Sequence, residues 1–194
     1  MRVTAGSARG KPLLTLEGDS VRPTGDKVKQ AVFSMLQFEL YGRRTLDLFA
    51  GSGQLGIEAL SRGAASCAFV DASADSIRII EKNLERTGPW PAVTVSHTDF
   101  RRFLDTQHTP FDLVFLEPPY HHGTAVEALT LLLERGLLSG RAIAVCEVDG
   151  AETLPAEVGG LFLDKLKRYR FTAVGIYRKR EESPIEDSSS SGQL

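Results

Sequence analysis

The 194-residue sequence contains only two cysteines, and it has no apolar run close to the roughly 18 residues that a membrane helix requires. Its first ten residues, MRVTAGSARG, lack the apolar core of a signal peptide. Cys67 and Cys146 each lie within an apolar run, which is typical of buried, reduced thiols rather than of a disulfide framework. The adjacent His121 and His122 have no evident third ligand, so no metal site is expected. These features predict a cytoplasmic protein that binds neither a metal nor a membrane.

The sequence also lacks a strong excess of positive charge. Its net charge of −2 and pI of about 6.1 argue against a protein that binds any polyanion indiscriminately. The charge is nevertheless uneven, because residues 1–45 carry eight basic and four acidic side chains, and residues 161–180 carry seven basic and one acidic. Runs of charge are more often solvated faces than binding sites, so these two regions alone leave nucleic-acid binding open. The acidic, serine-rich residues 181–194 are predicted to be disordered.

The remaining pattern predicts a single domain over residues 1–180. Residues 1–20 are predicted to form a β-hairpin, and the segment 22–40 a helix whose N-terminus Thr24 can cap. Apolar residues recur in that segment at helical spacing and should form one buried stripe. They are Val28, Val32, Met35, Leu36 and Leu40.

From residue 45 onward, strand patterns alternate with helix patterns, which defines a core over residues 45–180. This alternation predicts right-handed crossovers and a mainly parallel sheet with helices on both faces. The strand patterns lie at 45–50, 66–71, 92–97, 111–117 and 142–148. Two further strand patterns, 161–170 and 171–180, could form an antiparallel pair.

The first of these strands runs into a glycine-rich turn. Gly51, Gly53 and Gly56 match the pattern G-x-G-x-x-G, and Asp71 ends the next strand 20 residues after Gly51. Glycines let the backbone approach a ligand closely, and an acidic residue at the end of the second strand suits a ribose diol. By itself the pattern fits a nicotinamide oxidoreductase nearly as well as other nucleotide-binding proteins.

Asp47 favours a different cofactor. It places a carboxylate just before the glycine turn, where the pyrophosphate of a dinucleotide would meet unfavourable negative charge. A cofactor with an ammonium group there would be attracted, and S-adenosylmethionine has such a group. Asp99, after the third strand, then lies where an acid or its neighbouring amides could meet the adenine. The alternative is that Asp47 only makes a structural hydrogen bond to the loop.

These motifs resemble a known family. DLFAGSGQLG, the VDAS turn and the PPY corner are similar to the Rossmann-like S-adenosylmethionine-dependent methyltransferases, and among them to amino-group methyltransferases whose fourth strand ends in Asp/Asn-Pro-Pro-Tyr/Phe. RVTAGSARGKPL, VRPTGDKVKQAVFSML and LSRGAAS resemble, more narrowly, the RsmD family of bacterial small-subunit ribosomal RNA guanine-N2 methyltransferases. The resemblance covers residues 1–180. It implies an α/β fold with a mainly parallel seven-stranded sheet and an N-terminal β-hairpin, S-adenosylmethionine as cofactor, and 16S ribosomal RNA as partner of a monomeric protein.

The resemblance gives the corner LVFLEPPY a role. An exocyclic amino group is a poor nucleophile that must be aimed by hydrogen-bond acceptors, and two prolines hold a carbonyl that cannot swing away. In this interpretation the carboxylate of Glu117 and the carbonyl of Pro118 accept hydrogen bonds from the base, while Tyr120 stacks on it. Pro119 completes the rigid corner.

The candidate site residues fall into three groups. The catalytic candidates are Glu117, Pro118, Pro119 and Tyr120. The cofactor candidates are Thr24, Asp47, Phe49, Gly51, Ser52, Gly53, Asp71, Ala72, Asp99 and Phe100, although Phe49 also suits the core. The candidates for RNA contact are Arg2, Arg9, Lys11 and Arg22.

Glu117 departs from the family pattern, which usually has Asp, and the extra methylene shifts the carboxylate by about 1 Å. Three alternatives to guanine methylation therefore stay open. They are methylation of adenine N6 in DNA or RNA, a catalytically impaired protein that binds RNA or assists assembly, and a nicotinamide oxidoreductase. A duplex-embedded base is unreachable, so the target is expected to be flipped out or to lie in a loop, within a small ribosomal subunit or its assembly intermediate.

Overall fold

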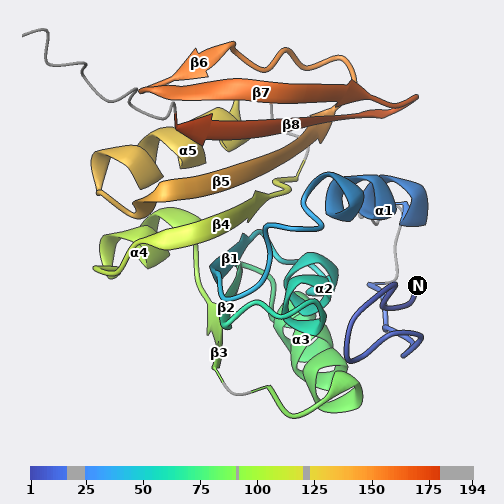
Figure 1. Ribbon diagram of the computed structural model, residues 1–194. Coiled ribbons are helices and arrows are strands. Elements are labelled where there is room, and N and C mark those ends of the chain that lie inside the picture. Colours follow the sequence, from blue (N-terminus) through green and yellow to red (C-terminus); the bar gives the residue numbers. More distant parts are fainter. Residues whose placement is uncertain (17–24, 91, 120–122, 180–194) are drawn as a thin grey trace, which may run out of the picture.

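The computed structural model describes residues 1–16, 25–90, 92–119 and 123–179. These residues form five helices and eight strands (Figure 1). The helices are α1 (Asp26–Met35), α2 (Gln54–Ser61), α3 (Ala74–Thr87), α4 (Phe100–Asp105) and α5 (Thr124–Glu134). The strands are β1 (Arg44–Leu48), β2 (Ser66–Asp71), β3 (Val93–His97), β4 (Phe111–Leu116), β5 (Leu138–Asp149), β6 (Glu157–Val158), β7 (Leu161–Arg168) and β8 (Thr172–Lys179). In these residues no helix is long and apolar enough to cross a membrane.

All eight strands form one mixed sheet in the order β3-β2-β1-β4-β5-β8-β7-β6. The first five are parallel to one another, and the last three join antiparallel. The expected alternation and the β7–β8 antiparallel pair are confirmed. Five of the eight strands are parallel, but the expected number of seven strands is wrong, because the two-residue β6, which is too short to leave a sequence pattern, adds an eighth.

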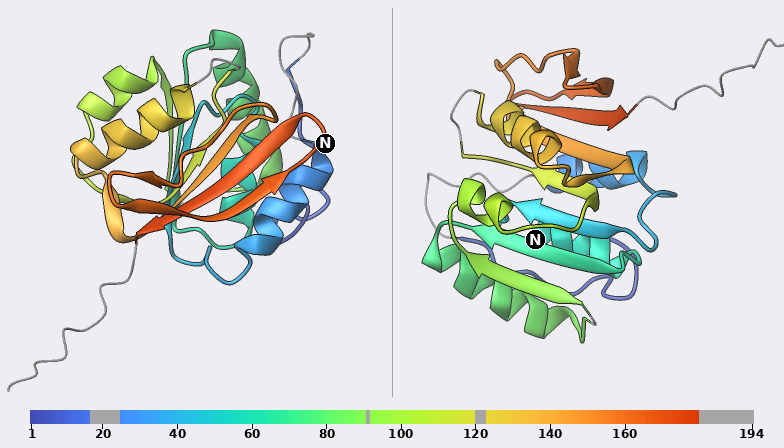
Figure 2. Two further views of the ribbon diagram at one scale, coloured as in Figure 1. Left: turned by 90° about the horizontal axis from the view of Figure 1, so that it is seen from above. Right: turned by 90° about the vertical axis from the view of Figure 1, so that its left-hand side faces the viewer.

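Helices cover both faces of this sheet, as Figure 2 shows. One core cluster lies between the sheet and helices α4 and α5, and a second lies between the sheet and helices α1 and α2. Strand β4 illustrates the division, because Val114 and Leu116 belong to the first cluster while Leu113 and Phe115 belong to the second. A strand with two covered faces needs apolar residues throughout, which explains its uninterrupted apolar run.

Helix α1 begins one residue later than Thr24 would require. Gly25 is its N-cap residue, and among the described residues no side chain forms a cap hydrogen bond, so the cap predicted at Thr24 stays a prediction. Thr24 itself lies outside the described residues. Helix α1 ends at Met35, so the predicted end at residue 40 is wrong. The predicted apolar residues are nevertheless buried together: Val32, Leu36 and Leu40 belong to the second cluster, and Val28 and Met35 pack against it.

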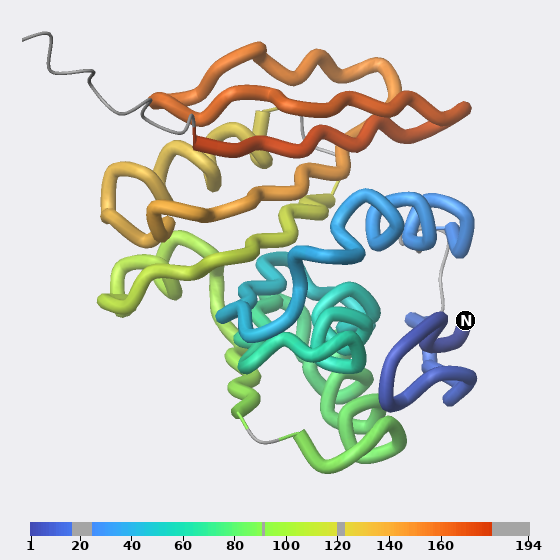
Figure 3. The backbone as a smooth tube through the Cα atoms, in the orientation of Figure 1, coloured from blue at the N-terminus to red at the C-terminus, as the bar shows by residue number. Residues whose placement is uncertain are grey.

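The N-terminal segment, residues 1–16, is not the expected β-hairpin. It contains no strand, only one isolated antiparallel bridge between Arg2 and Pro12. The chain does reverse direction, and backbone hydrogen bonds link Val3 with both Lys11 (3.0 Å) and Gly10 (2.8 Å). Figure 3 shows this segment lying beside α2 and α3 instead of joining the sheet.

The carboxylate of Glu58 on α2 attaches the N-terminal segment to the domain. Its Oε2 accepts a hydrogen bond from the backbone N–H of Thr4 (2.8 Å), and its Oε1 accepts from the Thr4 hydroxyl (2.6 Å) and the Ala5 N–H (3.0 Å). Lys29 Nζ of α1 lies 3.7 Å from Oε2, and both side chains are fully buried. Burial lowers the pKa of Lys29, while Glu58 opposes that shift. The buried Lys29–Glu58 ion pair is therefore supported by the hydrogen bonds that Glu58 accepts from the N-terminal segment.

Both cysteines are free and buried, as expected. Burial raises the pKa of the Cys67 thiol well above its usual value and that of Cys146 to about 12. Neither thiol is a nucleophile at neutral pH, because the thiolate is the reactive form.

We predict that Glu58→Gln lowers the free energy of unfolding by about 3 kcal/mol, because it leaves the Lys29 ammonium buried without its opposite charge. The measurement is urea unfolding, with Glu81→Gln on the exposed face of α3 as the matched control. A loss no greater than that of the control would show that the buried pair contributes nothing to stability.

Candidate active site

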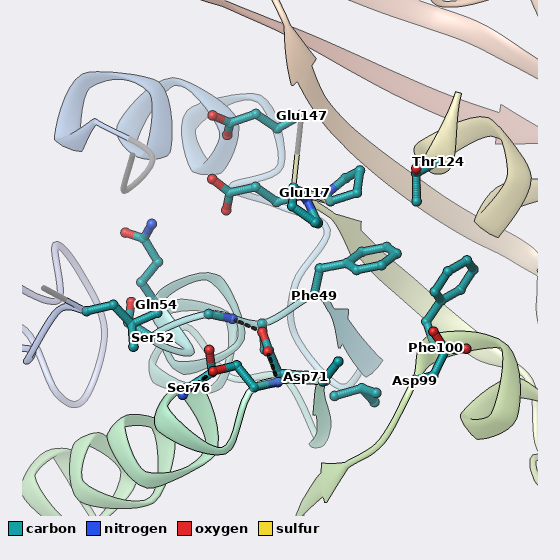
Figure 4. A pocket seen from close by; sticks show the side chains of 18 of the residues that line it. Phe49, Ser52, Gln54, Asp71, Ser76, Asp99, Phe100, Glu117, Thr124 and Glu147 are labelled. Atoms are coloured by element: carbon teal, nitrogen blue, oxygen red, sulfur yellow. Dashed lines mark hydrogen bonds between the residues drawn. The ribbon is translucent and has the colours of Figure 1, made fainter. Parts of the chain in front are cut away.

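A cavity of about 770 Å³ opens at the carboxyl ends of the parallel strands. It lies where the strand order reverses, between the loops that follow β1 and β2 and the corner that follows β4. Open α/β sheets bind ligands at this position, and the volume is that of a site for a small molecule or cofactor. Figure 4 shows its two acidic ends, with Asp71 and Asp99 on one side of Phe49 and Glu117 and Glu147 on the other.

Asp71 shapes one end of the cavity. Its Oδ2 accepts a hydrogen bond from the Gly51 N–H, and its Oδ1 accepts from the Ser73 N–H, each at 2.8 Å. The carboxylate thus joins the glycine turn after β1 to the turn after β2. Each oxygen retains a lone pair for a ligand hydroxyl.

The other two glycines of the motif are required by the backbone and by packing. Gly53 has φ 76° and is the N-cap of α2, in a conformation that L side chains rarely adopt. A Cβ on Gly56 would lie 2.3 Å from the Phe69 ring of β2, so only glycine lets α2 pack this closely on the sheet. Gly51 lines the cavity, whereas Gly53 does not.

Asp47 lies beneath the glycine turn and does not line the cavity. Leu46 and Leu48 on either side of it pack in the cluster of α4 and α5, so alternation along β1 turns Asp47 toward α2. Its Oδ2 accepts a hydrogen bond from the buried Gly56 N–H at 2.9 Å, and the residue is only 2% exposed. Burial raises the pKa of this carboxyl well above its usual value, and Glu117 and Asp71 add to that effect. This is the structural hydrogen bond that the sequence left open as the alternative.

Phe49 separates the two ends of the cavity. Its φ of 77° is positive, which is strained for a bulky residue, and it is the one non-glycine residue with this feature in the described part of the chain. The Phe49 and Phe100 rings lie 4.9 Å apart, and both line the cavity. They provide an apolar wall beside Asp71 and Asp99 (Figure 4).

Glu117, Pro118, Pro119 and Glu147 line the second end. Phe115 of β4 and Val145 of β5 face α1 and α2, so two residues later Glu117 and Glu147 leave the sheet on this same face. The close view shows their carboxylates pointing in one direction (Figure 4). Two carboxylates therefore lie side by side next to the rigid prolyl corner.

Asn83 connects the N-terminal segment with the glycine turn. It is fully buried on α3, where its Nδ2 donates to Leu14 O and Ser52 O, both at 2.9 Å, and its Oδ1 accepts from the Leu14 N–H at 2.8 Å. The next two residues, Thr15 and Leu16, line the cavity. The N-terminal segment thus completes a wall of the site.

The structure brings most of the predicted cofactor and catalytic residues together in this one cavity. Those that line it are Phe49, Gly51, Ser52, Asp71, Ala72, Asp99, Phe100, Glu117, Pro118 and Pro119. Asp47 and Gly53 lie behind the glycine turn. Predictions for Tyr120, Thr24 and Arg22 concern positions outside the described residues.

The predicted RNA contacts in the N-terminal segment do not line the cavity. Arg2 Nη1 donates to Gly10 O at 3.1 Å and Lys11 Nζ to Thr87 O at 2.8 Å, while Arg9 is exposed. Two of these three cations are therefore engaged with backbone carbonyls, although each retains further donors.

Sequence reasoning missed several residues that line the cavity, and Glu147 is the most important of them. One signal could have found it, because Asp71, Glu117 and Glu147 are all acidic residues within two residues of the carboxyl end of an apolar strand. Thr15 and Leu16 left no such signal, since they reach the site only through tertiary contacts. Within the described residues, no group of three or more histidine, cysteine, aspartate or glutamate side chains could hold a metal ion.

The sheet order, the glycine turn and the cavity define the class of S-adenosylmethionine-dependent methyltransferase folds. Magnesium protoporphyrin IX methyltransferase from Synechocystis, solved with bound S-adenosylmethionine, shares the fold at a TM-score of 0.64 and 14% identity, over 79% of each chain. A family described as "Conserved hypothetical protein 95" matches residues 1–178, and the chain belongs to this family.

Several relatives whose names describe methyltransferases are similar to this chain along most of its length. "Putative rRNA methyltransferase YlbH" of Bacillus subtilis is 41% identical over 93% of this chain and 100% of its own length. "Ribosomal RNA small subunit methyltransferase D" of Escherichia coli K12 is 30% identical over 94% of this chain and 91% of its own. The solved structure called "Putative methyltransferase yhhF from Escherichia coli" superposes with a TM-score of 0.82 at 30% identity, covering 94% of this chain and 99% of that one.

We predict that the stability of the protein relative to an Asp47→Asn variant falls as the pH rises. The folded state holds the Asp47 proton above the usual carboxyl pKa, so its stabilising effect is complete below about pH 4 and is lost as the pH rises through the raised pKa, by up to about 1.4 kcal/mol per pH unit. The measurement is the free energy of unfolding of both proteins at several pH values. A constant difference between them would show that Asp47 titrates as it does in the unfolded chain.

Proposed function

We propose that this protein is an S-adenosylmethionine-dependent methyltransferase that methylates the exocyclic N2 of a guanine in small-subunit (16S) ribosomal RNA. The observation that carries the proposal is one cavity with two differently built ends, a glycine turn closed by Asp71 and a prolyl corner with Glu117. Membership of the family and the names of the relatives support ribosomal RNA as the substrate class.

The glycine-turn end fits the cofactor. Asp71 offers lone pairs to the ribose hydroxyls, Phe49 and Phe100 offer an apolar wall, and Asp99 lies at the start of α4 on the same side. Asp99 accepts a hydrogen bond from the Arg101 N–H at 2.9 Å, which orders the first turn of α4 beside the adenine position we propose. S-adenosylmethionine supplies an electrophilic methyl group when it is bound.

The prolyl end fits the base. The lone pair of an exocyclic amino group is delocalised into the ring, so the group must be held by acceptors and aimed at the methyl donor. The Glu117 carboxylate and the Pro118 carbonyl are such acceptors, and their rigid corner limits the positions that the N–H groups can take. The product cation is strongly acidic, so the chemistry does not require a dedicated strong base.

Glu147 adds a second negative charge beside Glu117. Positive charge develops on the attacking nitrogen during methyl transfer, and carboxylates fixed near that position stabilise it more than they stabilise the neutral base. We assign Glu147 to this electrostatic role.

The RNA substrate must bring an accessible base to this corner. We propose that the target guanine is flipped out or lies in a loop, and that Tyr120 stacks on it. The modest net charge supports a structured substrate, such as a small ribosomal subunit or its assembly intermediate, over bare RNA bound by charge alone. We further propose that the protein acts as a monomer in the cytoplasm. Arg2, Arg9, Lys11 and Arg22 are proposed to contact its phosphates.

The test is methyl transfer from labelled S-adenosylmethionine to small ribosomal subunits that lack N2-methylguanosine in their RNA. We predict label in N2-methylguanosine after digestion to nucleosides. Label in N6-methyladenosine would favour the adenine alternative. Binding of the cofactor and the subunit without any label would favour an impaired protein that binds RNA.

We predict that Glu117→Asp lowers kcat by about 10- to 100-fold, because the shorter side chain withdraws the carboxylate by about 1 Å from a corner built around glutamate. Steady-state kinetics with subunits as substrate measure this, together with the Kd for S-adenosylmethionine, which should change little. Glu134→Gln on the exposed part of α5 is the matched control. Higher activity with aspartate would mean that the natural glutamate impairs the site.

A further inference from the structure

The turn between β7 and β8 lies at the same edge of the sheet as the cavity. Strand β5 pairs with β8 so that Val148 lies opposite Ala173 and Asp149 opposite Thr172. Val148 and Thr172 both line the cavity, and Thr172 directly follows the turn residues 169–171. The turn therefore adjoins the end of the cavity that contains Glu117 and Glu147.

Pairing across the sheet relates this hairpin to the prolyl corner. Glu147 of β5 lies opposite Val174 of β8, and Val174 lies opposite Lys167 of β7. Paired residues project on the same face, so Lys167 leaves the sheet on the side of Glu147, two strand spacings or about 10 Å away. A strand of RNA whose base enters the cavity would pass this position with its neighbouring phosphates.

The tip carries exposed cations and an exposed ring. Lys165, Lys167 and Arg170 are exposed, and none of them forms an ion pair with another described residue. The Arg170 guanidinium lies 4.8 Å from the centre of the Phe171 ring, and Phe171 is 50% exposed. Such a set of cations with an aromatic surface binds a single-stranded nucleic acid through its phosphates and its unstacked bases.

Hydrogen bonds hold this tip in one shape. Tyr169 N donates to Thr172 O at 2.7 Å, which closes the turn. Gly150 N donates to Phe171 O at 3.0 Å, and Arg168 Nη1 donates to Gly150 O at 2.8 Å, which attach the turn to the loop after β5. A fixed surface loses little conformational entropy when it binds.

We infer that the β7–β8 tip (Lys165, Lys167, Arg170 and Phe171) is the surface that binds the RNA strand next to the target nucleotide. The inference rests on the proposed function and specifies where its substrate binds. Lys167 and Arg170 contact phosphates, and Phe171 stacks on an unpaired base. This inference assigns RNA binding to part of the basic segment 161–180, whose charge alone left nucleic-acid binding open.

The experiment compares Lys167→Gln/Arg170→Gln with Lys82→Gln/Arg86→Gln, which removes two exposed cations from α3. Affinity for small ribosomal subunits is measured by co-sedimentation at several salt concentrations, and methylation of the same subunits is measured in parallel. We expect the tip variant to bind about 10-fold more weakly, with the slope of log affinity against log salt reduced by roughly 1.5, while the α3 variant is unchanged. The affinity for S-adenosylmethionine and the midpoint of thermal unfolding should stay the same in both.

The outcomes separate this inference from the proposed function. Equal binding by the tip variant and the natural protein, or an equal loss in both variants, would overturn the inference even if the natural protein methylates guanine. Weaker binding confined to the tip variant would support the surface even if the subunits acquire no methyl group. That result would contradict the proposed methyl transfer and would still support the β7–β8 tip as an RNA-binding surface.

Discussion

The reversal of strand order at β1 is the constraint on which the candidate site depends. Strand β1 pairs with β2 on one side and with β4 on the other, so the loops that leave their carboxyl ends diverge and open a crevice. The glycine turn and Asp71 enter that crevice from one side, and Glu117 enters it from the other. The fold thus places the glycine turn and Asp71 opposite Glu117 and the prolyl corner, although these residues are far apart in the sequence.

Three buried polar side chains keep the loops around this crevice in place. Asp47 binds the start of α2, Asn83 binds the glycine turn and the N-terminal segment, and Glu58 binds that segment again next to Lys29. Each of them forms hydrogen bonds with backbone groups that are buried or partly buried. Removing such polar groups from water costs free energy, but their hydrogen bonds fix the loops that form the walls of the cavity. Preorganised walls suit the proposed reaction, which would require a base to be positioned to within about an ångström.

The sequence predicted the parts of the fold that follow from local patterns. The parallel strands could be recognised because both of their faces are buried, and the glycine motif and the prolyl corner identified two segments that line the cavity. The N-terminal segment was mistaken for a hairpin because its hydrogen bonds go to α2 and α3, which no local pattern reveals. The direction of the Asp47 side chain likewise depends on packing across β1. Glu147 was missed because it lies near Glu117 only after β5 pairs with β4 in the folded protein.

The central claim is that one cavity holds the cofactor at Asp71 and the base at Glu117. A crystal structure of the protein with S-adenosylhomocysteine tests it most directly. The account predicts that the ribose hydroxyls lie within hydrogen-bond distance of the Asp71 carboxylate and that the sulfur faces the Glu117 corner. A ligand bound outside this cavity, or one with its ribose turned away from Asp71, would contradict it.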